Sequence, residues 1–351
     1  MPLRTRLALL TAGLTVATCL TAAGPAQAQP STASHACSPS VSIDRFSDAL
    51  DKTTYQDTFV GNLSALAVDS DGSVAALSDR SSLFRLDART LKPRSVVPLA
   101  DETGSALDSE GLVVDRDGTR LVTSETEPSV RRYSRTGKIL DRLPVPDDLR
   151  VSPAGRARPN GTFEGLTLLP GGRTLVASME YALSGDSADT VRFQTWDRHR
   201  GHFRLGPRYA YRTDPGLGVS EIQAAPDGRL LVLERGFTSG VGNTVRLYLA
   251  DPRHAMRKTL LTDLATCPPL GATAKQPQPN PLLDNIEAMT ITGRTKNTLK
   301  LLLTSDDNQN PTQTTRFYYL RVRASAQGPG ELRDQPQRSR TRERRETVTA
   351  G

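Results

Sequence analysis

The feature that most constrains this chain is a pattern that recurs five times along its length. Each copy has an acidic or hydroxyl residue, a short apolar run, a turn, a second apolar run and a closing acid. Short apolar runs divided by turn residues are typical of β-hairpins, because an amphipathic helix would instead repeat its apolar residues every 3.6 positions. The five predicted hairpins cover residues 64–79, 110–125, 164–180, 221–234 and 287–307.

Three of these hairpins carry an Asp-Gly pair at the turn, at Asp71-Gly72, Asp117-Gly118 and Asp227-Gly228. Asp-Gly between two strands favours a two-residue type I′ turn, in which both residues have positive φ. Such a turn fixes which residues face each other across the hairpin. The predicted opposed pairs are Ser64 with Asp79, Glu110 with Glu125, Glu164 with Glu180, Glu221 with Glu234, and Glu287 with Asp306 or Asp307.

Further strand-like runs follow each hairpin, such as residues 83–86 and 94–99 after the first. The last repeat has only one such run, residues 316–322, so its missing strand is expected from residues 41–46 or 55–60. Five units of about four strands, closed by joining the two ends of the chain, describe an all-β fold, a single β-propeller of four-stranded blades. The long interval before the last repeat leaves six blades as the alternative.

The first strand of every blade in a propeller lines the central channel, so the repeated acids are expected at one mouth of that channel. Like charges directly opposed destabilise a sheet, and a bound cation would compensate them. Carboxylate oxygens suit Ca²⁺, which takes about six to eight oxygen ligands. The alternative is that the acids pair with arginines and cap the hairpins. The candidate metal ligands are Asp79, Glu110, Glu125, Glu164, Glu180, Glu221, Glu234, Glu287, Asp306 and Asp307.

The two ends of the chain predict export and divide the sequence into segments. Residues 1–28 are typical of a secretory signal peptide, with Arg4 and Arg6 before an apolar stretch and a cleavage site before Gln29. Cys19 raises lipid anchoring as an alternative. Residues 29–40 are expected to form an N-terminal arm, 41–323 the propeller domain, and 324–351 a disordered, arginine-rich tail.

Export also bears on the cysteines. Cys37 and Cys267 are the two that would remain after cleavage, and in an oxidising compartment they are expected to form a disulfide. This pairing would tie the N-terminal arm to the proline-rich segment 268–281.

Charge and motifs exclude several classes of function. The formal net charge of +7 comes in large part from the two ends, and only 5% of the residues are aromatic, so a nucleic-acid partner is not expected. The sequence has no G-x-S-x-G elbow, phosphate-binding P-loop or dinucleotide fingerprint. No membrane span is expected, and we predict a monomer.

Five strings within the repeats carry a resemblance: DSEGLVV (108–114), FEGLTL (163–168), SEI with LLVLERGF (within 220–237), DNIEAM (284–289) and TSDDNQ (304–309). In this order they resemble the phytase-like domain family, whose members are labelled "esterase-like activity of phytase". The resemblance covers residues 41–322 and implies a secreted or periplasmic β-propeller that hydrolyses phosphoesters or carboxyl esters. The sequence departs from the family pattern at Ser64, which replaces a repeated acid, and at Ala288, where glycine is frequent.

The leading hypothesis is a secreted hydrolase of a small-molecule ester or phosphoester, assisted by Ca²⁺ at the acidic mouth. The cation would polarise the ester oxygen and lower the pKa of a bound water. Which acid binds the cation and which is the general base stays open. The alternatives are a non-enzymatic propeller that binds a metal, sugar or envelope ligand, and a metal-dependent lactonase-like propeller. The candidate catalytic residues are Glu110, Glu164, Glu221, Glu287, Arg80 and Arg235.

Overall fold

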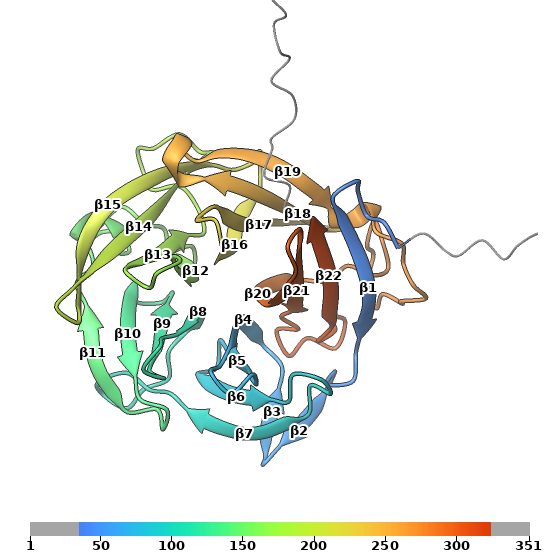
Figure 1. The fold of residues 1–351 in the computed structure, drawn as a ribbon, viewed down its shortest axis with the longest axis horizontal. Helices are drawn as coiled ribbons and strands as arrows, with labels where there is room; N and C mark the ends of the chain where they lie inside the picture. The colour runs from blue at the N-terminus through green and yellow to red at the C-terminus, as the bar shows by residue number, and fades with distance from the viewer. Residues whose placement is uncertain (1–34, 324–351) are drawn as a thin grey trace, which may run out of the picture. The chain divides into compact units, whose positions relative to one another are not determined.

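Five four-stranded antiparallel sheets surround a central axis in the computed structural model, which describes residues 35–323 (Figure 1). Each sheet is one blade of a β-propeller, and the innermost strands of neighbouring blades contact each other around the whole ring. The predicted fold class is therefore confirmed, with five blades. The predicted signal peptide and the arginine-rich tail lie outside the described residues. The innermost strands are β4 (Leu63–Val68), β8 (Ser109–Val114), β12 (Phe163–Leu168), β16 (Gly218–Ala224) and β20 (Ile286–Arg294).

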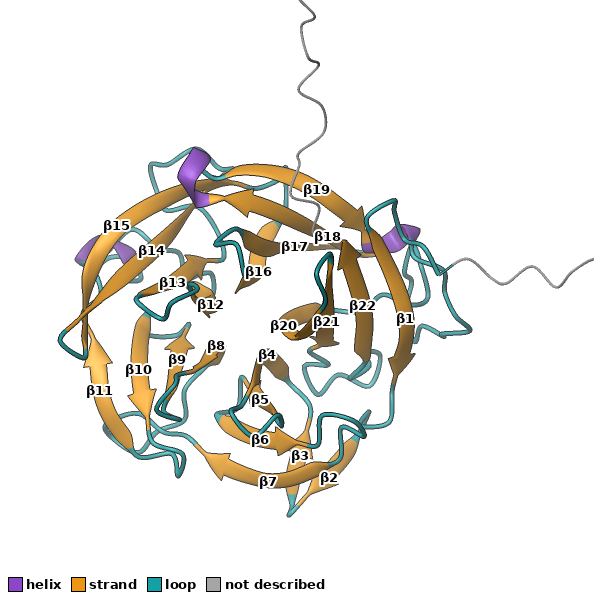
Figure 2. Cartoon of the chain, in the orientation of Figure 1, coloured by secondary structure: helices purple, strands orange, loops and turns teal. Residues whose placement is uncertain are grey.

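Four blades are continuous in sequence and run outward from the axis, with loops joining them (Figure 2). The first continues through β5 (Val74–Ser78), β6 (Ser82–Leu86) and β7 (Pro93–Pro98), and the second through β9 (Arg120–Ser124), β10 (Ser129–Tyr133) and β11 (Ile139–Leu143). The third continues through β13 (Thr174–Met179), β14 (Thr190–His199) and β15 (His202–Arg212). The fourth continues through β17 (Leu230–Thr238), β18 (Gly242–Asp251) and β19 (Arg257–Asp263). The helical elements in the described residues are short 3₁₀ turns at Asp147–Leu149, Pro252–His254 and Leu264–Thr266.

The fifth blade closes the ring with strands from both ends of the domain. It contains β20, β21 (Thr298–Ser305) and β22 (Phe317–Arg323), and its outer strand is β1 (Val41–Ser47). β1 pairs antiparallel with β22, with Val41 opposite Val322. Of the two predicted candidates for this strand, residues 41–46 are therefore correct. Residues 55–60 belong instead to a separate hairpin of β2 (Thr53–Tyr55) and β3 (Thr58–Val60).

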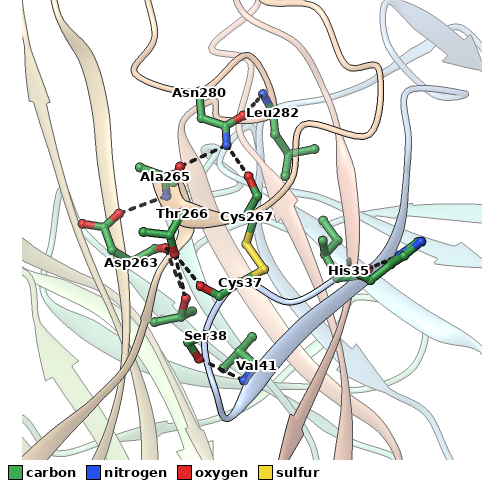
Figure 3. The surroundings of a disulfide bond; sticks show 12 residues. His35, Cys37, Ser38, Val41, Asp263, Ala265, Thr266, Cys267, Asn280 and Leu282 are labelled. Carbon is green, nitrogen blue, oxygen red and sulfur yellow. Dashed lines mark hydrogen bonds between the residues drawn. A yellow bond between two sulfur atoms is a disulfide. The ribbon is translucent and has the colours of Figure 1, made fainter. Parts of the chain in front are cut away.

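A disulfide fastens the closing strand to the neighbouring fourth blade. Cys37 and Cys267 are bonded, as predicted, and they join the segment before β1 to the loop after β19 (Figure 3). Thr266 Oγ1 donates to the Cys37 carbonyl at 2.7 Å, and Asn280 Nδ2 donates to the Cys267 carbonyl at 2.7 Å. Ser38 Oγ adds a bond to the Leu261 carbonyl of β19 at 2.7 Å. The end of the chain that closes the propeller is thus held both covalently and by hydrogen bonds.

The predicted type I′ turns are wrong, and the pairing of residues across each of these hairpins therefore differs from the predicted one. Asp69 N–H donates to Ser73 O at 2.8 Å and Gly72 N–H donates to Asp69 O at 2.9 Å, so the loop has three residues. Gly72 has a positive φ of 78° whereas Asp71 does not, and the Asp71 carboxylate accepts from Ser73 N–H at 2.9 Å. Gly118 and Gly228 close the same kind of loop. A turn in which only the glycine is left-handed adds one residue to the hairpin.

A second departure from the predicted register is a β-bulge at the start of every innermost strand. The strand pairing shifts around Ser64, Glu110, Glu164, Ser220 and Glu287. The predicted opposed pairs are therefore not direct partners. Glu125 N–H, for example, donates to Asp108 O at 2.8 Å, while Glu110 lies in the bulge. Bulges re-aim side chains and are frequent beside functional sites.

We predict that replacing both Cys37 and Cys267 with serine lowers the free energy of unfolding by about 2–5 kcal/mol, because the closing strand loses its covalent tie. This loss corresponds to a fall in melting temperature of roughly 5–15 °C, to be measured by circular dichroism. Reducing the wild-type protein should reproduce the fall. Ser38→Ala, which keeps the disulfide, should cost only about 1 kcal/mol. An unchanged melting temperature in the double variant would show that hydrogen bonds alone hold β1.

Candidate functional site

Carboxylates gather at the end of the blades where the innermost strands begin. Two residues from each blade lie at this end, one in the bulge and one, the partner position, in or just after the second strand. The bulge positions hold Ser64, Glu110, Glu164, Ser220 and Glu287. The partner positions hold Asp79, Glu125, Glu180, Arg235 and Asp306. We call the acids among them, together with Asp108, the acidic cluster: Asp79, Asp108, Glu110, Glu125, Glu164, Glu180, Glu287 and Asp306.

The tightest part of the acidic cluster lies between the second and third blades. Asp108, Glu110 and Glu125 each offer an oxygen within 4.8 Å of the others, and Glu125, Glu164 and Glu180 do the same. Asp108 is half-buried and the other four are buried. Glu125 belongs to both groups. This arrangement provides the oxygen ligands of a hard divalent cation.

Burial and mutual repulsion raise the pKa of most of these acids. Burial, Glu180 and Asp108 together raise the pKa of Glu125 to about 7. Burial raises the pKa of Asp79 to about 6, with contributions from Asp108 and Glu287. Burial and neighbouring carboxylates also hold the pKa values of Glu110 and Glu164 well above the ordinary range. Without a cation, the acidic cluster therefore keeps protons that isolated carboxyl groups would lose.

Three arginines border the acidic cluster. Arg235 lies 3.0 Å from Glu287 and 3.5 Å from Glu180, and these carboxylates keep its pKa raised although burial lowers it. Arg80 lies 3.5 Å from Asp79 and is two-thirds exposed. Arg158 covers the ring of Tyr181 at 3.4 Å, beside Glu180. The predicted Arg80 and Arg235 are thus brought to the cluster. Arg158 and Tyr181 were not predicted from the sequence, because they lie in loops outside the repeated pattern.

In three blades the residue two positions before the bulge also belongs to the site, and the sequence did not lead us to predict it. Asn285 Nδ2 donates to Glu287 Oε1 at 2.9 Å, and Asn62 Nδ2 donates to Asp79 Oδ2 at 3.3 Å. Asp108 occupies the same position in the second blade. Their constant spacing from the repeated residue was a usable sequence signal. These amides orient two of the carboxylates.

The fourth blade differs from the prediction by one residue. Ser220, like Glu110 and Ser64, lies eight residues before its turn glycine, so Ser220 and not Glu221 takes the bulge position. Glu221 aligns with Gly111 and Gly165 and is buried, with Oε1 accepting from Ile222 N–H at 2.8 Å. Burial raises its pKa well above the ordinary value, although hydrogen bonds from the N–H groups of Ile222, Leu166 and Met289 lower it. The structure therefore does not place Glu221 in the acidic cluster.

Glu234 and Asp307 also lie outside the acidic cluster. Glu234 accepts from the Tyr211 hydroxyl at 2.6 Å and from Asp214 N–H at 2.8 Å, and it pairs with Lys258. Asp307 pairs with Lys52 and accepts from Asn62 N–H at 3.0 Å. Both carboxylates are occupied by groups of the protein. Arg235, one residue after Glu234, takes the partner position of the fourth blade.

The opposite end of the innermost strands has a different character. A hollow of about 340 Å³ is lined there by strand ends and turns, including Val68, Val114, Leu168 and Gln223, with no acid among its lining residues. This hollow therefore offers no carboxylate to a bound cation. Within the described residues, no helix has the length and hydropathy that crossing a bilayer would require.

Known proteins resemble this chain to different degrees. An uncharacterized secreted protein of Arthroderma benhamiae is 27% identical over 208 residues, covering 45% of this chain and 40% of that protein. The chain thus spans less than half the length of that relative. A gluconolactonase from Xanthomonas campestris is 17% identical with a TM-score of 0.41, covering 73% of this chain and 71% of its own. The Cps50 (Swd1) β-propeller domain of Myceliophteria thermophila is 14% identical with a TM-score of 0.36, covering 70% of this chain and 65% of its own.

One family model matches residues 58–309, which contain all five inner hairpins, from β4 to β21. Its description is "Esterase-like activity of phytase". The match includes Asp79, Asp108 and every other residue of the acidic cluster. The chain belongs to the Phytase-like family.

Proposed function

We propose that this protein is a secreted hydrolase that cleaves a small-molecule phosphoester or carboxyl ester at the acidic cluster, with the help of a divalent cation, for which Ca²⁺ is the candidate. The observation that carries the proposal is the pair of overlapping carboxylate groups centred on Glu125. The family description supports ester hydrolysis. The disulfide and the secreted relative support export.

The residues present fit a hard cation. Asp108, Glu110, Glu125, Glu164 and Glu180 offer only oxygen, and the cluster holds no histidine or cysteine that would favour a softer metal. Of the ion pairs within residues 35–323, only that of Arg235 with Glu180 reaches these five carboxylates. A divalent cation bound there would polarise the ester oxygen and lower the pKa of a bound water.

The protein's own groups would bind the substrate and move the proton. Arg235 is anchored by Glu287 and Glu180 and keeps an Nε without a hydrogen-bond partner. Arg235 and the more exposed Arg80 and Arg158 would orient an anionic group by charge-assisted hydrogen bonds. Asp79, Glu287 and Asp306 lie outside the two tight groups, so they are the acids left to accept a proton from water. Glu221 has a structural role in this proposal, because it accepts from the N–H groups of Leu166 in β12 and Met289 in β20.

We predict that Glu110→Gln and Glu164→Gln each lower kcat/KM by roughly 100-fold, because each removes a charge that the cation needs. The assay is hydrolysis of 4-nitrophenyl phosphate and 4-nitrophenyl acetate after metal removal, with and without added Ca²⁺. Glu127→Gln is the matched control, since this exposed acid bonds Arg131 and Arg142 only two residues from Glu125. Absence of turnover on both esters in the wild-type protein would favour a binding propeller. Turnover of lactones alone would favour the lactonase-like alternative.

The arginines give a second prediction. Arg158→Ala should raise KM for 4-nitrophenyl phosphate several-fold and leave KM for 4-nitrophenyl acetate unchanged, because only the phosphate carries a charge for the guanidinium to bind. Arg158 is exposed, so the substitution should not unfold the protein. Equal changes for both esters would remove Arg158 from anion recognition. Arg89→Ala, a change in an exposed arginine of a surface turn between β6 and β7, is the control.

A third prediction concerns Glu221 and uses stability as its readout. Because its folded-state pKa is raised, its contribution is fully present below the unfolded pKa near about 4.3 and is lost as pH rises through the folded value. Glu221→Gln does not titrate. The stability of this variant relative to wild type should therefore increase as pH rises above about 4.3, by up to about 1.4 kcal/mol per pH unit, and is followed by its melting temperature.

The control for this experiment has the opposite sign. Burial raises the pKa of Glu127, but bonds to Arg142 and Arg131 outweigh it and leave the pKa lowered. Glu127→Gln should therefore lose stability relative to wild type as pH rises. All melts are run in chelator, so that cation binding does not contribute. A relative stability of Glu221→Gln that falls with pH would show that the three N–H groups hold an ionised carboxylate.

A further inference from the structure

The two tight carboxylate groups share one residue. Asp108, Glu110 and Glu125 form the first group, and Glu125, Glu164 and Glu180 form the second. In each group every residue has a ligand oxygen within 4.8 Å of the other two. Five carboxylates thus form two adjoining ligand sets around a single shared side chain.

The fold fixes Glu125 between these two sets. Glu125 follows β9 in the second blade, whereas Glu164 and Glu180 belong to the third. Thr162 of the third blade donates its hydroxyl to the Glu125 carbonyl at 2.7 Å and its N–H to Glu125 Oε1 at 3.3 Å. The side chain that both groups share is therefore attached to both blades. Hydrogen bonds of this kind hold a ligand residue in position, as a metal site needs.

The charge at this junction exceeds what one divalent cation could balance. The five carboxylates carry a formal charge of −5 when ionised, and the ion pair that reaches them within residues 35–323 is that of Arg235, at 3.5 Å from Glu180. With Arg235, a single divalent ion would leave a formal charge of −2 in a buried place. Two divalent ions with Arg235 would balance it.

A second observation points to an absent ligand on the side of Asp108. Ser64 Oγ and Asn62 Oδ1 have no hydrogen-bond partner, and Ser64 and Asn62 are only 2% and 0% exposed. Ser64 holds the bulge position next to that of Glu110, and Ser109 N–H donates to Asp79 O at 3.2 Å. A buried oxygen without a partner costs about 1–3 kcal/mol. Water molecules carried by a cation at the first group would supply these missing donors.

We propose that the acidic cluster binds two divalent cations side by side, one held by Asp108, Glu110 and Glu125 and the other by Glu125, Glu164 and Glu180. This proposal rests on the proposed function in that it places the cations at the same site. It does not depend on whether that site hydrolyses esters. Two-metal sites separated by about 3.5–4 Å are suited to phosphoester hydrolysis, because the two ions can stabilise both the attacking and the leaving oxygen of an in-line displacement at phosphorus. The two-cation site therefore favours a phosphoester over a carboxyl ester as the substrate of this protein, in keeping with the arginines at its border.

The test measures stoichiometry and spin coupling with Mn²⁺ alone. Metal-stripped protein is dialysed against Mn²⁺, and the bound metal is counted and examined by electron paramagnetic resonance. Wild type should bind two ions per chain with an exchange-coupled spectrum. Glu180→Gln should keep one ion with an uncoupled signal, and Glu125→Gln should lose the coupling. Glu125→Asp, which retains the charge, guards against a folding defect, and Glu127→Gln should behave as wild type.

The outcomes separate this inference from the proposed hydrolase. One ion per chain in wild type, unaffected by Glu180→Gln, would overturn the two-cation site even if the protein hydrolyses esters. Two coupled ions without turnover of any ester would leave the site standing and contradict the hydrolase. No bound Mn²⁺ would overturn the two-cation site.

Discussion

Repulsion among carboxylates that are buried together is the interaction on which the rest of this propeller depends. Two ionised carboxylates about 4 Å apart repel by roughly 4 kcal/mol at the effective dielectric constant of a protein surface. The acidic cluster places several such contacts between the second and third blades. The protein must then retain protons, as the raised pKa values of Glu125 and Asp79 indicate, or bind cations. Buried carboxylates of this kind destabilise the folded protein unless protons or cations neutralise them.

The bulges make this crowding sterically possible. Each one turns the repeated residue at the start of an innermost strand, and in every blade but the fourth, which has Glu221, a small residue follows it so that neighbouring strands can approach. A side chain at Gly111 would collide with the Glu164 carbonyl, and one at Gly165 would lie 2.8 Å from Glu221 Oε1. Ala288 and Ala65 are buried at the same position in their blades, where the approach admits a methyl group. The small residues at this position therefore let the inner strands approach closely enough to bring the carboxylates together.

The site arises where the fivefold repeat is broken. The second and third blades contribute four glutamates, the first contributes Ser64 in place of an acid, and the fourth contributes Ser220 and Arg235. Arg235 thus brings a positive charge into a position that carries a carboxylate in the other four blades. An equal ring of acids would have no preferred place for a cation or for an anionic substrate. The unequal ring concentrates glutamates between the second and third blades and sets the guanidinium of Arg235 beside them, in contact with Glu180 and Glu287.

The sequence by itself determined the propeller fold and the pairing of Cys37 with Cys267, because apolar periodicity, turn residues and cysteine count are local properties. It left five or six blades and two candidate closing strands, between which the tertiary structure decided. It also indicated most of the acidic cluster. The tertiary structure alone decided the register. Side chains alternate faces along a strand, so a shift of one residue moves a side chain to the other face of the sheet. The three-residue turns and the bulges produce such shifts, which exclude Glu221 and Glu234 and bring in Arg235. Loop residues such as Arg158 join the site only through the folding of distant segments, for which no sequence period exists.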